Sequence, residues 1–426
     1  MNIELINTGT ELLLGAVLNT HQQWLGRQLA ELGRRVTRQV TVPDSASAIR
    51  QAVQEALSRA DLVLVTGGLG PTSDDLTREE IAALLGRKLQ SDAGIAARIE
   101  GFFAASHRPM PDQVRVQAMV PEGATVLTNE HGTAPGLALL IEPNPFRPAG
   151  GRSLLILLPG PPRELRPMFQ NQVLRLVEQI FPDVEPFATR TLRTTGLGES
   201  RVEERISVPL QPHLAAGLEV GYCARPGEVD VRLIARGPEA STTVKTAEQI
   251  VRQQLGSAIF GEGQETLEAV VVRRLIERGQ TLVVAESCTG GQLGHRVTNV
   301  PGASAVFRGG VIAYSNQTKL HLLGVQAGTL ATHGAVSEAT AREMAEGVRR
   351  IGSADFALAI TGIAGPGGGS ADKPVGTAFI GLASAGATRV ERQCNPYDRE
   401  TFKWVTSQQA LDLLRRALGA QARAGN

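Results

Sequence analysis

Short apolar runs alternate with longer amphipathic segments through the first part of the chain. Residues 3–7 predict a strand, and residues 21–32 predict a helix because their apolar side chains recur at helical spacing. Strands at 35–42 and 61–66 and a helix at 46–58 continue the alternation. The strand at 61–66 is rich in valine and leucine without polar alternation, which is typical of a parallel sheet covered by helices on both faces. The pattern therefore predicts a doubly wound α/β domain.

The pattern changes after this domain, which we expect to close with a buried strand at 153–158 and a helix near 165–180. Beyond about residue 182, strands at 189–195 and 229–235 accompany helices near 199–206 and 244–255. Proline and glycine break the pattern around residues 209–217 and at Arg225-Pro226-Gly227. This segment is typical of a small α+β module.

The last third of the chain returns to the first pattern. A helix at 267–279 precedes a strand at 281–285, and a further apolar strand is predicted at 354–361. We therefore expect three units: an N-terminal doubly wound domain at 1–170, a small α+β module at 171–260 and a C-terminal α/β domain at 261–426.

The composition argues against several classes of protein. Lys and Arg total 43 against 42 Asp and Glu, and only 11 Phe, 3 Tyr and 2 Trp are present for base stacking, so nucleic acid is not the expected partner. The three cysteines are far apart and give neither a disulfide framework nor a CxxC metal pair. The first residues lack a basic segment and no apolar run reaches the length of a membrane span, so we expect a cytoplasmic protein without a membrane partner.

The richest segment for chemistry is TGGLGPTSDDLT at 66–77, where a predicted buried strand ends and a helix begins. Ligands of open α/β sheets lie outside the carboxyl ends of the strands, and free amides in a glycine-rich loop suit a phosphate. This predicts a phosphate site at Thr66, Gly67, Gly68 and Gly70, and a divalent cation such as Mg²⁺ at Asp74 and Asp75. The alternative is that an aspartate only caps the next helix and that the glycines form a turn.

Four motifs of this domain, taken together, resemble the molybdopterin-binding-like domain of CinA proteins: TGTEL at 8–12, Asn19-Thr20, the 66–77 segment and LPGPPREL at 158–165. The resemblance implies cleavage of the pyrophosphate of ADP-ribose with a divalent cation, and with potassium as a further candidate ion. Glu11, Asp74 and Asp75 match the acidic positions of the family motif. The segment NEHGTAPG at 129–136 is interpreted as a second lip of the same cleft. The residues expected to contact the ligand are Glu11, Asn19, Thr66, Gly67, Gly68, Gly70, Asn129 and Gly160.

A second candidate site follows the strand at 281–285, in the segment ESCTGG at 286–291. A serine at a strand-to-helix turn faces a substrate, and the amides that follow it provide an oxyanion or phosphate site. Lys319 is the candidate base beside Tyr314, because a buried lysine can lose its proton and an arginine cannot readily do so. Three alternatives stay open on the residues alone: Ser287 or Thr289 caps the helix, Lys319 is a solvated surface charge, or Cys288 is the nucleophile.

Three motifs of the last domain resemble the nicotinamide-nucleotide amidase domain of CinA proteins: AESCTGG, FRGGVIAYSNQTK, and LAITGIAGPGGG followed by KPVGTAFIGL. The resemblance implies hydrolysis of nicotinamide mononucleotide to nicotinic acid mononucleotide and ammonia, without a cofactor. It makes Ser287 the nucleophile, Lys319 the base and Tyr314 the partner of that base. The residues that it implies in substrate binding are Thr289, Gly290, Gly291, Thr361, Gly362, Gly365 and Arg399.

The middle module resembles the KH-like module that joins the two halves of CinA proteins. Its segment Gly196-Leu197-Gly198-Glu199 lacks the GXXG spacing with which KH domains grip RNA, so we interpret it as a spacer and oligomerisation element. The favoured function is a bifunctional hydrolase of small pyridine-nucleotide metabolites that acts as a homodimer. The alternatives are a molybdopterin-binding protein, and a non-catalytic partner protein in competence or DNA damage.

Overall fold

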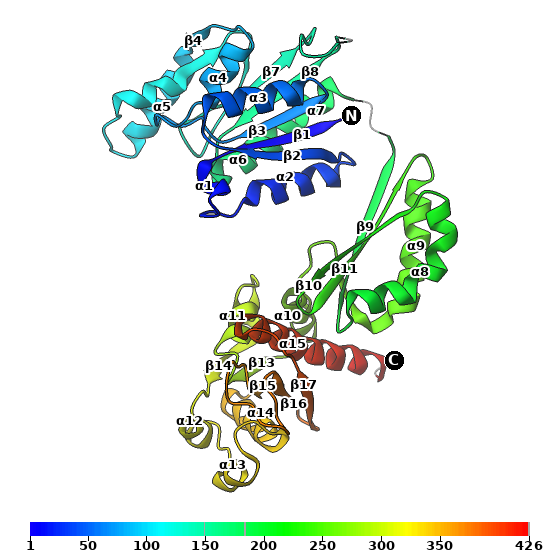
Figure 1. Cartoon of the computed structure of the whole chain (residues 1–426). Coiled ribbons are helices and arrows are strands. Elements are labelled where there is room, and N and C mark those ends of the chain that lie inside the picture. The colour runs from blue at the N-terminus through cyan, green and yellow to red at the C-terminus, as the bar shows by residue number, and fades with distance from the viewer. Residues whose placement is uncertain (149, 183–184, 425–426) are drawn as a thin grey trace. The chain divides into compact units, whose positions relative to one another are not determined.

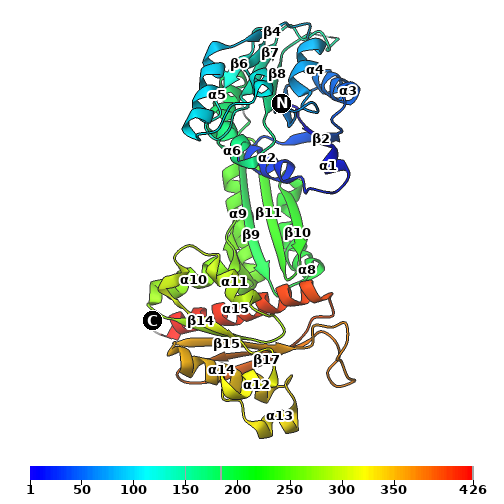
Figure 2. The same cartoon turned by 90° about the vertical axis from the view of Figure 1, so that its left-hand side faces the viewer.

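The computed structural model describes residues 1–148, 150–182 and 185–424, with side chains up to residue 419 (Figures 1 and 2). It divides into two compact units, Met1–Pro186 and Phe187–Asn426. The boundary expected at residue 170 falls inside a continuous helical segment, because Val173 and Val177 pack into the core of the first unit. The first unit therefore extends to Pro186, and residues 187–260 and 261–426 form one compact unit with a separate sheet in each part.

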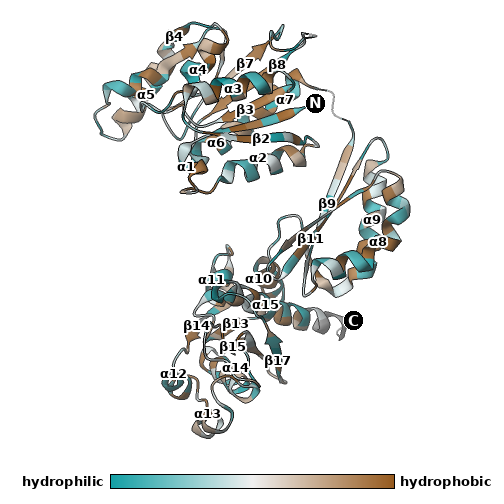
Figure 3. Ribbon diagram, viewed as in Figure 1, coloured by the Kyte–Doolittle hydropathy of each residue, from teal (hydrophilic) through white to brown (hydrophobic). Residues whose placement is uncertain are grey.

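The first unit is built on a six-stranded sheet with the order β2-β1-β3-β8-β7-β6. Its four leading strands are parallel, whereas β7 runs antiparallel to β8 and β6 antiparallel to β7. Strands β3, β7 and β8 carry mostly hydrophobic residues (Figure 3). The sheet strands are β1 (Ile3–Thr8), β2 (Val36–Val42), β3 (Leu62–Thr66), β6 (Thr125–Leu127), β7 (Gly136–Ile141) and β8 (Ser153–Leu158); β4 (Leu89–Ser91) and β5 (Met119–Pro121) pair separately.

Helices cover both faces of this sheet, which confirms the doubly wound prediction. Alternate strand residues such as Val63 and Leu64 enter two different apolar cores. One core is completed by α3 (Ala46–Leu57), α4 (Thr77–Leu84) and α5 (Ala93–Ala105), and the other by α2 (Thr20–Glu31), α6 (Pro162–Met168) and α7 (Leu174–Ile180). The short helix α1 (Thr10–Leu13) follows β1 and buries none of its residues.

The second unit begins with a four-stranded antiparallel sheet of the order β10-β11-β9-β12. Helices α8 and α9 pack on it through apolar residues spaced by three or four positions, among them Ile206 and Val251. The elements are β9 (Phe187–Thr195), α8 (Glu199–Ala215), β10 (Glu219–Arg225), β11 (Glu228–Arg236), α9 (Ala240–Leu255) and β12 (Ile259–Glu262).

The helix predicted near 199–206 is longer than expected, because α8 continues to Ala215 through Pro209 and Pro212. A proline inside a helix removes one backbone hydrogen bond and disfavours the helical conformation of the residue before it. Here Val202, Ile206 and Leu210 are buried one turn apart against the sheet. Burial of this apolar row keeps the segment helical despite the two prolines.

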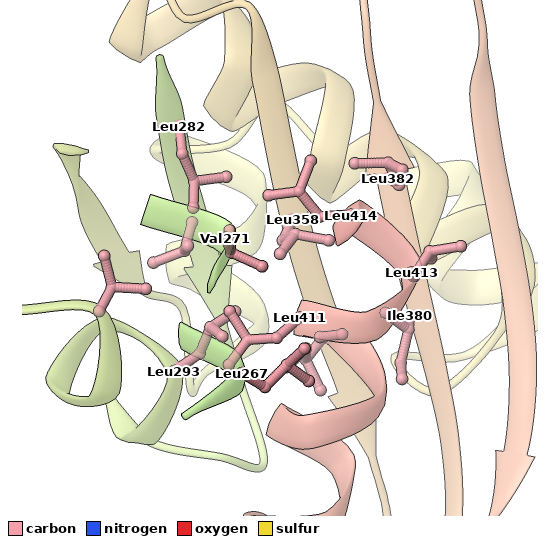
Figure 4. Close-up of a cluster of buried hydrophobic side chains, with 14 of the residues drawn as sticks. Leu267, Val271, Leu282, Leu293, Leu358, Ile380, Leu382, Leu411, Leu413 and Leu414 are labelled. Carbon is pink, nitrogen blue, oxygen red and sulfur yellow. The ribbon is translucent and has the colours of Figure 1, made fainter. Parts of the chain in front are cut away.

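The last part of the chain carries a five-stranded sheet of the order β14-β13-β15-β16-β17, parallel from β14 to β15 and antiparallel thereafter. One face packs against α10, α11 and α15 through a leucine-rich core (Figure 4). The other face packs against α14. The elements are α10 (Leu267–Arg278), β13 (Leu282–Glu286), α11 (Gln292–Thr298), β14 (Phe307–Ile312), α12 (Asn316–His321), α13 (Ala327–His333), α14 (Glu338–Gly352), β15 (Phe356–Gly362), β16 (Thr377–Ala383), β17 (Thr388–Cys394) and α15 (Arg399–Ala424).

Within the described residues, none of the helices combines the length and the hydropathy needed to cross a bilayer.

Candidate active site

Ser287 lies at the carboxyl end of β13, the central one of three parallel strands. Its amide donates to the carbonyl of Ile360 in β15 (2.9 Å), and the carbonyl of Glu286 accepts from the amide of Ala313, which follows β14 (2.7 Å). Both neighbouring strands therefore hold the turn that carries the serine. The residue is 8% exposed, so only a small part of its surface faces outward.

Lys319 projects from α12 and meets Ser287, although 32 positions separate the two residues in the chain. Its Nζ lies 3.1 Å from Ser287 Oγ and also contacts the carbonyl oxygens of Ala313 (2.8 Å) and Tyr314 (3.2 Å). The side chain is 1% exposed, and this burial lowers the pKa of Lys319. A neutral amine has two N–H bonds and one lone pair. The two carbonyls can accept from the N–H bonds, which leaves the lone pair to accept the Ser287 proton.

Tyr314 differs from its expected role. Its backbone carbonyl helps to hold Lys319, but its hydroxyl accepts a hydrogen bond from Arg399 Nη2 (2.8 Å), and no bond joins this hydroxyl to the lysine. The ring is 61% exposed. The phenol and the Arg399 guanidinium therefore form an outer wall of the site.

Cys288, the rival nucleophile, is 7% exposed and lies in the apolar core. Burial raises the pKa of its thiol to about 12. Because the thiolate is the reactive form, a thiol that stays protonated at neutral pH is a poor nucleophile. The geometry favours Ser287.

The carboxylate of Glu286 organises the turn after Ser287, a role that we did not predict. It is 1% exposed and accepts hydrogen bonds from the amides of Gly291 (3.1 Å), Leu293 (3.0 Å) and Gly294 (2.8 Å) at the start of α11. An acidic residue just before a helix is the sequence signal that points to it, since carboxylates favour helix N-termini.

These contacts change the expectation for the amides near the nucleophile. The amide of Gly291 donates to Glu286, and the amide of Gly290 donates to the carbonyl of Ser287 (3.1 Å), so neither faces a substrate. Through the described chain, the amides of Cys288 and Thr289 donate to no other residue. They directly follow the nucleophile and are the remaining candidates for an oxyanion site. The hydroxyl of Thr289 is buried without a partner among the described residues.

Replacing Glu286 with Gln is expected to lower the free energy of unfolding by about 1–3 kcal/mol, because one of its two acceptor oxygens becomes a donor that faces backbone amides. Denaturant titration of the full chain measures this. The control is Glu277→Gln, since Glu277 is 61% exposed and its ion pair with Arg273 is long, at 3.9 Å. Equal free energies of unfolding for the two variants would show that the hydrogen bonds of the Glu286 carboxylate do not stabilise this turn.

The loop after β15 was expected to bind substrate through Thr361, Gly362 and Gly365. The hydroxyl of Thr361 instead donates to the carbonyl of Ala335 (2.7 Å). Gly362 meets a packing demand, since a Cβ there would stand 2.7 Å from the carbonyl oxygen of Thr377. The carbonyl of Gly365 accepts from Arg399 Nη1 (2.9 Å), so this loop positions the arginine beside the site.

In the first unit, the glycine-rich loop closes against the end of β1 and the loop after β8. A Cβ on Gly67 would stand 2.7 Å from the carbonyl oxygen of Thr8, and one on Gly160 would stand 3.9 Å from Gly67 Cα. Gly67 and Gly68 have φ values of 98° and 65°, which favour glycine. The amide of Gly67 donates to the carbonyl of Leu158 (3.0 Å). Along the described loop the amides of Gly68 and Gly70 have no acceptor, so they stay free for a phosphate.

The two aspartates after this loop differ. Asp75 is half-buried, and its carboxylate accepts from the amide of Thr72 (3.0 Å) and from the hydroxyl of that residue. Asp74 is exposed. No group of three His, Cys, Asp or Glu residues suited to a metal occurs among the residues that the structure describes. Two carboxylates still fit Mg²⁺, which often takes one or two carboxylates and completes its shell with water and substrate phosphates.

Glu11, Asn19 and Thr66 surround the beginning of the same loop. Asn19 caps α2 by accepting from the amide of Gln22 (3.1 Å), and it donates to Asn7 Oδ1 (2.9 Å). Asn7 in turn donates to the hydroxyl of Thr66 (2.6 Å), which is buried. The Glu11 carboxylate lies over Gly9, where a Cβ would stand 2.7 Å from its Oε1. These contacts show Asn19 and Thr66 supporting the loop, and Glu11 exposed beside it.

Asn129 holds together the segment 129–136, which was expected to form a second lip of the cleft. Its Nδ2 donates to the carbonyl of Ala134 (2.7 Å) and to Glu164 Oε2 (2.8 Å), and its Oδ1 accepts from the amide of His131 (2.9 Å). Glu164, a buried carboxylate that our sequence interpretation left without a role, ties this lip to α6. The segment also lines a cleft of about 330 Å³, whose walls are formed by Ile95, Arg98, Ile99, Phe102, Val126, Thr128, Asn129, Glu130, Gly132, Thr133 and Pro135.

Comparison with protein families gives three matches along the chain. Residues 4–179 match a probable molybdopterin binding domain, residues 189–261 match a damage-inducible protein CinA KH domain, and residues 264–418 match the CinA C-terminal domain. The three matches confirm the mixed α/β fold class, with a KH-like module between its two larger parts.

Relatives extend over the whole chain. A putative competence-damage inducible protein of Moorella thermoacetica is 45% identical over 99% of this chain and 100% of its own. A CinA-like protein of Akkermansia muciniphila is 44% identical over 96% of both chains. A crystal structure of a competence damage-inducible protein from Klebsiella pneumoniae is 40% identical, covers 36% of this chain and 95% of its own, and has a TM-score of 0.35. With this coverage and identity, the chain belongs to the CinA family and carries a molybdopterin-binding-like domain at its N-terminal end.

Proposed function

We propose that residues 261–426 hydrolyse the carboxamide of a pyridine mononucleotide, converting nicotinamide mononucleotide to nicotinic acid mononucleotide and ammonia. The observation that carries this proposal is the 3.1 Å contact between Ser287 Oγ and the buried Nζ of Lys319. A serine whose proton can pass to a lysine of lowered pKa is an activated nucleophile.

The reaction proceeds in two halves. Ser287 Oγ attacks the carboxamide carbon while Lys319 takes its proton, and the oxygen of the tetrahedral adduct is stabilised by the amides of Cys288 and Thr289. The adduct collapses as Lys319 returns the proton to the leaving nitrogen, which departs as ammonia and leaves a serine ester. Water then attacks the ester carbon while Lys319 takes its proton. As the bond between this carbon and Ser287 Oγ breaks, Lys319 returns the proton to Oγ, so the carboxylic acid is released and Ser287 is restored. No cofactor enters this scheme.

The test is ammonia release from nicotinamide mononucleotide by the full chain, with the acid product identified by mass spectrometry. Release in a one-to-one ratio with the acid supports the proposal. A folded chain that releases no ammonia overturns it and favours a binding role.

We further propose that the first unit cleaves the pyrophosphate of ADP-ribose, with phosphate oxygens on the free amides of Gly68 and Gly70. The observation that favours this is the pair of free amides beside Asp74 and Asp75. A divalent cation held by these carboxylates would withdraw charge from the pyrophosphate. Potassium stays a prediction of the resemblance, and the homodimer stays a prediction from the presence of two active sites on one chain. The alternative for this unit is a molybdopterin-binding role, which a chain without ADP-ribose cleavage would favour.

Replacing Asp74 with Asn is expected to lower metal-dependent cleavage of ADP-ribose about a hundredfold, because the cation loses one of two carboxylates. Asp74 is the better choice than Asp75, whose carboxylate also holds Thr72. Chromatography of the products at saturating Mg²⁺ measures the loss, with Asp112→Asn at a fully exposed carboxylate as the control. Unchanged cleavage in Asp74→Asn would show that Asp74 does not hold the cation. Ammonia release should be the same in the wild-type chain and in both variants.

A further inference from the structure

Lys403 places a positive charge beside the nucleophile turn, and no motif had singled it out. The residue lies in α15, and its Nζ is 4.0 Å from the point where a Cβ on Gly290 would stand. Gly290 is bonded through its amide to the carbonyl of Ser287. The ammonium therefore lies over the turn that carries the nucleophile.

The packing of α15 fixes this position. Phe402, the neighbour of Lys403, is fully buried in the same core as Cys288 and Leu293. Side chains four positions apart share a helix face, so Lys403 and Arg399 lie one above the other. Arg399 reaches Tyr314 and Gly365 on the outer side of the site. Two cations of one helix thus flank the region of Ser287.

No carboxylate neutralises Lys403. Within the described chain its ammonium has neither an ion pair nor a hydrogen bond. Of the acidic groups around it, Glu286 accepts from three amides, and Asp398 accepts from the amides of Glu400 and Thr401. The carboxylate of Glu400, three positions before Lys403, is exposed and, among the described residues, makes no ion pair with it. A half-buried ammonium without an anion, next to a nucleophile, suits an anionic part of the substrate.

We propose that Lys403, together with Arg399, binds the phosphate of the mononucleotide and so makes the site select nucleotides over nucleosides. This inference rests on the proposed amidase function, and it names the group that selects the substrate. The amide nitrogens of Gly290 and Gly291 are occupied within the protein, so side-chain cations supply the binding of this phosphate. Lysine is a common phosphate ligand because it acts as a compact point charge.

The test compares nicotinamide mononucleotide with nicotinamide riboside, which lacks the phosphate, in the full chain. Lys403→Ala is expected to lower the preference for the mononucleotide, taken as the ratio of kcat/KM values, about tenfold through KM. Lys403→Arg should restore most of it. The matched control is Lys245→Ala, at an exposed lysine of α9. An unchanged preference, or an equal loss for both substrates, would overturn the inference.

A second measurement separates this inference from the amidase proposal. Calorimetric titration of nicotinamide mononucleotide into the Ser287→Ala chain, with and without Lys403→Ala, needs no turnover. Weaker binding in the double variant supports the phosphate contact, whether or not the wild-type chain releases ammonia. If the wild-type chain releases none, only the amidase proposal fails. Identical affinities in the two chains would overturn the phosphate contact whatever the turnover.

Discussion

Ser287→Ala is expected to lower ammonia release from nicotinamide mononucleotide by about a thousandfold or more. The variant removes the only hydroxyl that Lys319 Nζ contacts among the described residues. Alanine fits the turn, because the amide of residue 287 still donates to the carbonyl of Ile360. We therefore expect the melting temperature to change little while turnover disappears.

The matched control for this variant is Cys288→Ala, which removes the other candidate nucleophile one position away. Because burial raises the pKa of that thiol to about 12, we expect this variant to retain activity. It should lose some stability, since Cys288 packs in the apolar core. Activity that survives in Ser287→Ala and disappears in Cys288→Ala would reverse the assignment.

The fold was largely predictable because its signals are local. Apolar runs such as residues 61–66 predicted the buried strands, and the alternation of strands and helices predicted a sheet covered by helices on both faces. The continuation of the helix through Pro209 was missed because proline is a local signal for the end of a helix. The burial of Leu210 that keeps the segment helical exists only once the helix has packed on the sheet. The boundary at 170 was missed for the same kind of reason, since Val177 belongs to a core assembled from distant segments.

The candidate site was predictable in its residue types and less so in its contacts. The contact between Ser287 and Lys319 depends on β14 lying beside β13, because β14 leads into the turn before α12. A sequence pattern does not fix that strand order. The amide of Gly291 is a second case: a glycine-rich turn predicts free amides, but the buried Glu286 carboxylate binds this one. Lys403 gave no signal because its relation to Gly290 exists only once α15 has packed.

Lys319→Arg is the sharpest test of the base, and we expect it to lower kcat about a hundredfold to ten-thousandfold. Arginine keeps the positive charge and a long side chain, but it stays protonated at every accessible pH and has no lone pair to accept the Ser287 proton. Lys319→Met should be equally inactive, so the two variants together separate loss of charge from loss of basicity. The control is Lys373→Arg, because Lys373 is only half-buried and its Nζ bonds only the carbonyl of His333 among the described residues.

The wild-type pH profile tests the same base without any variant that could misfold. Burial lowers the pKa of Lys319, so the neutral amine forms at a lower pH than in an exposed lysine. The catalytic form is the neutral one. The ratio kcat/KM should therefore rise with pH and level off above this lowered pKa, and it should fall about tenfold for each pH unit below it. The limb should lie below the ordinary pKa of lysine, which is about 10.4. A profile that keeps rising to that value, or that lacks an acidic limb across the range in which the chain is folded, would show that Lys319 is not the group that takes the proton.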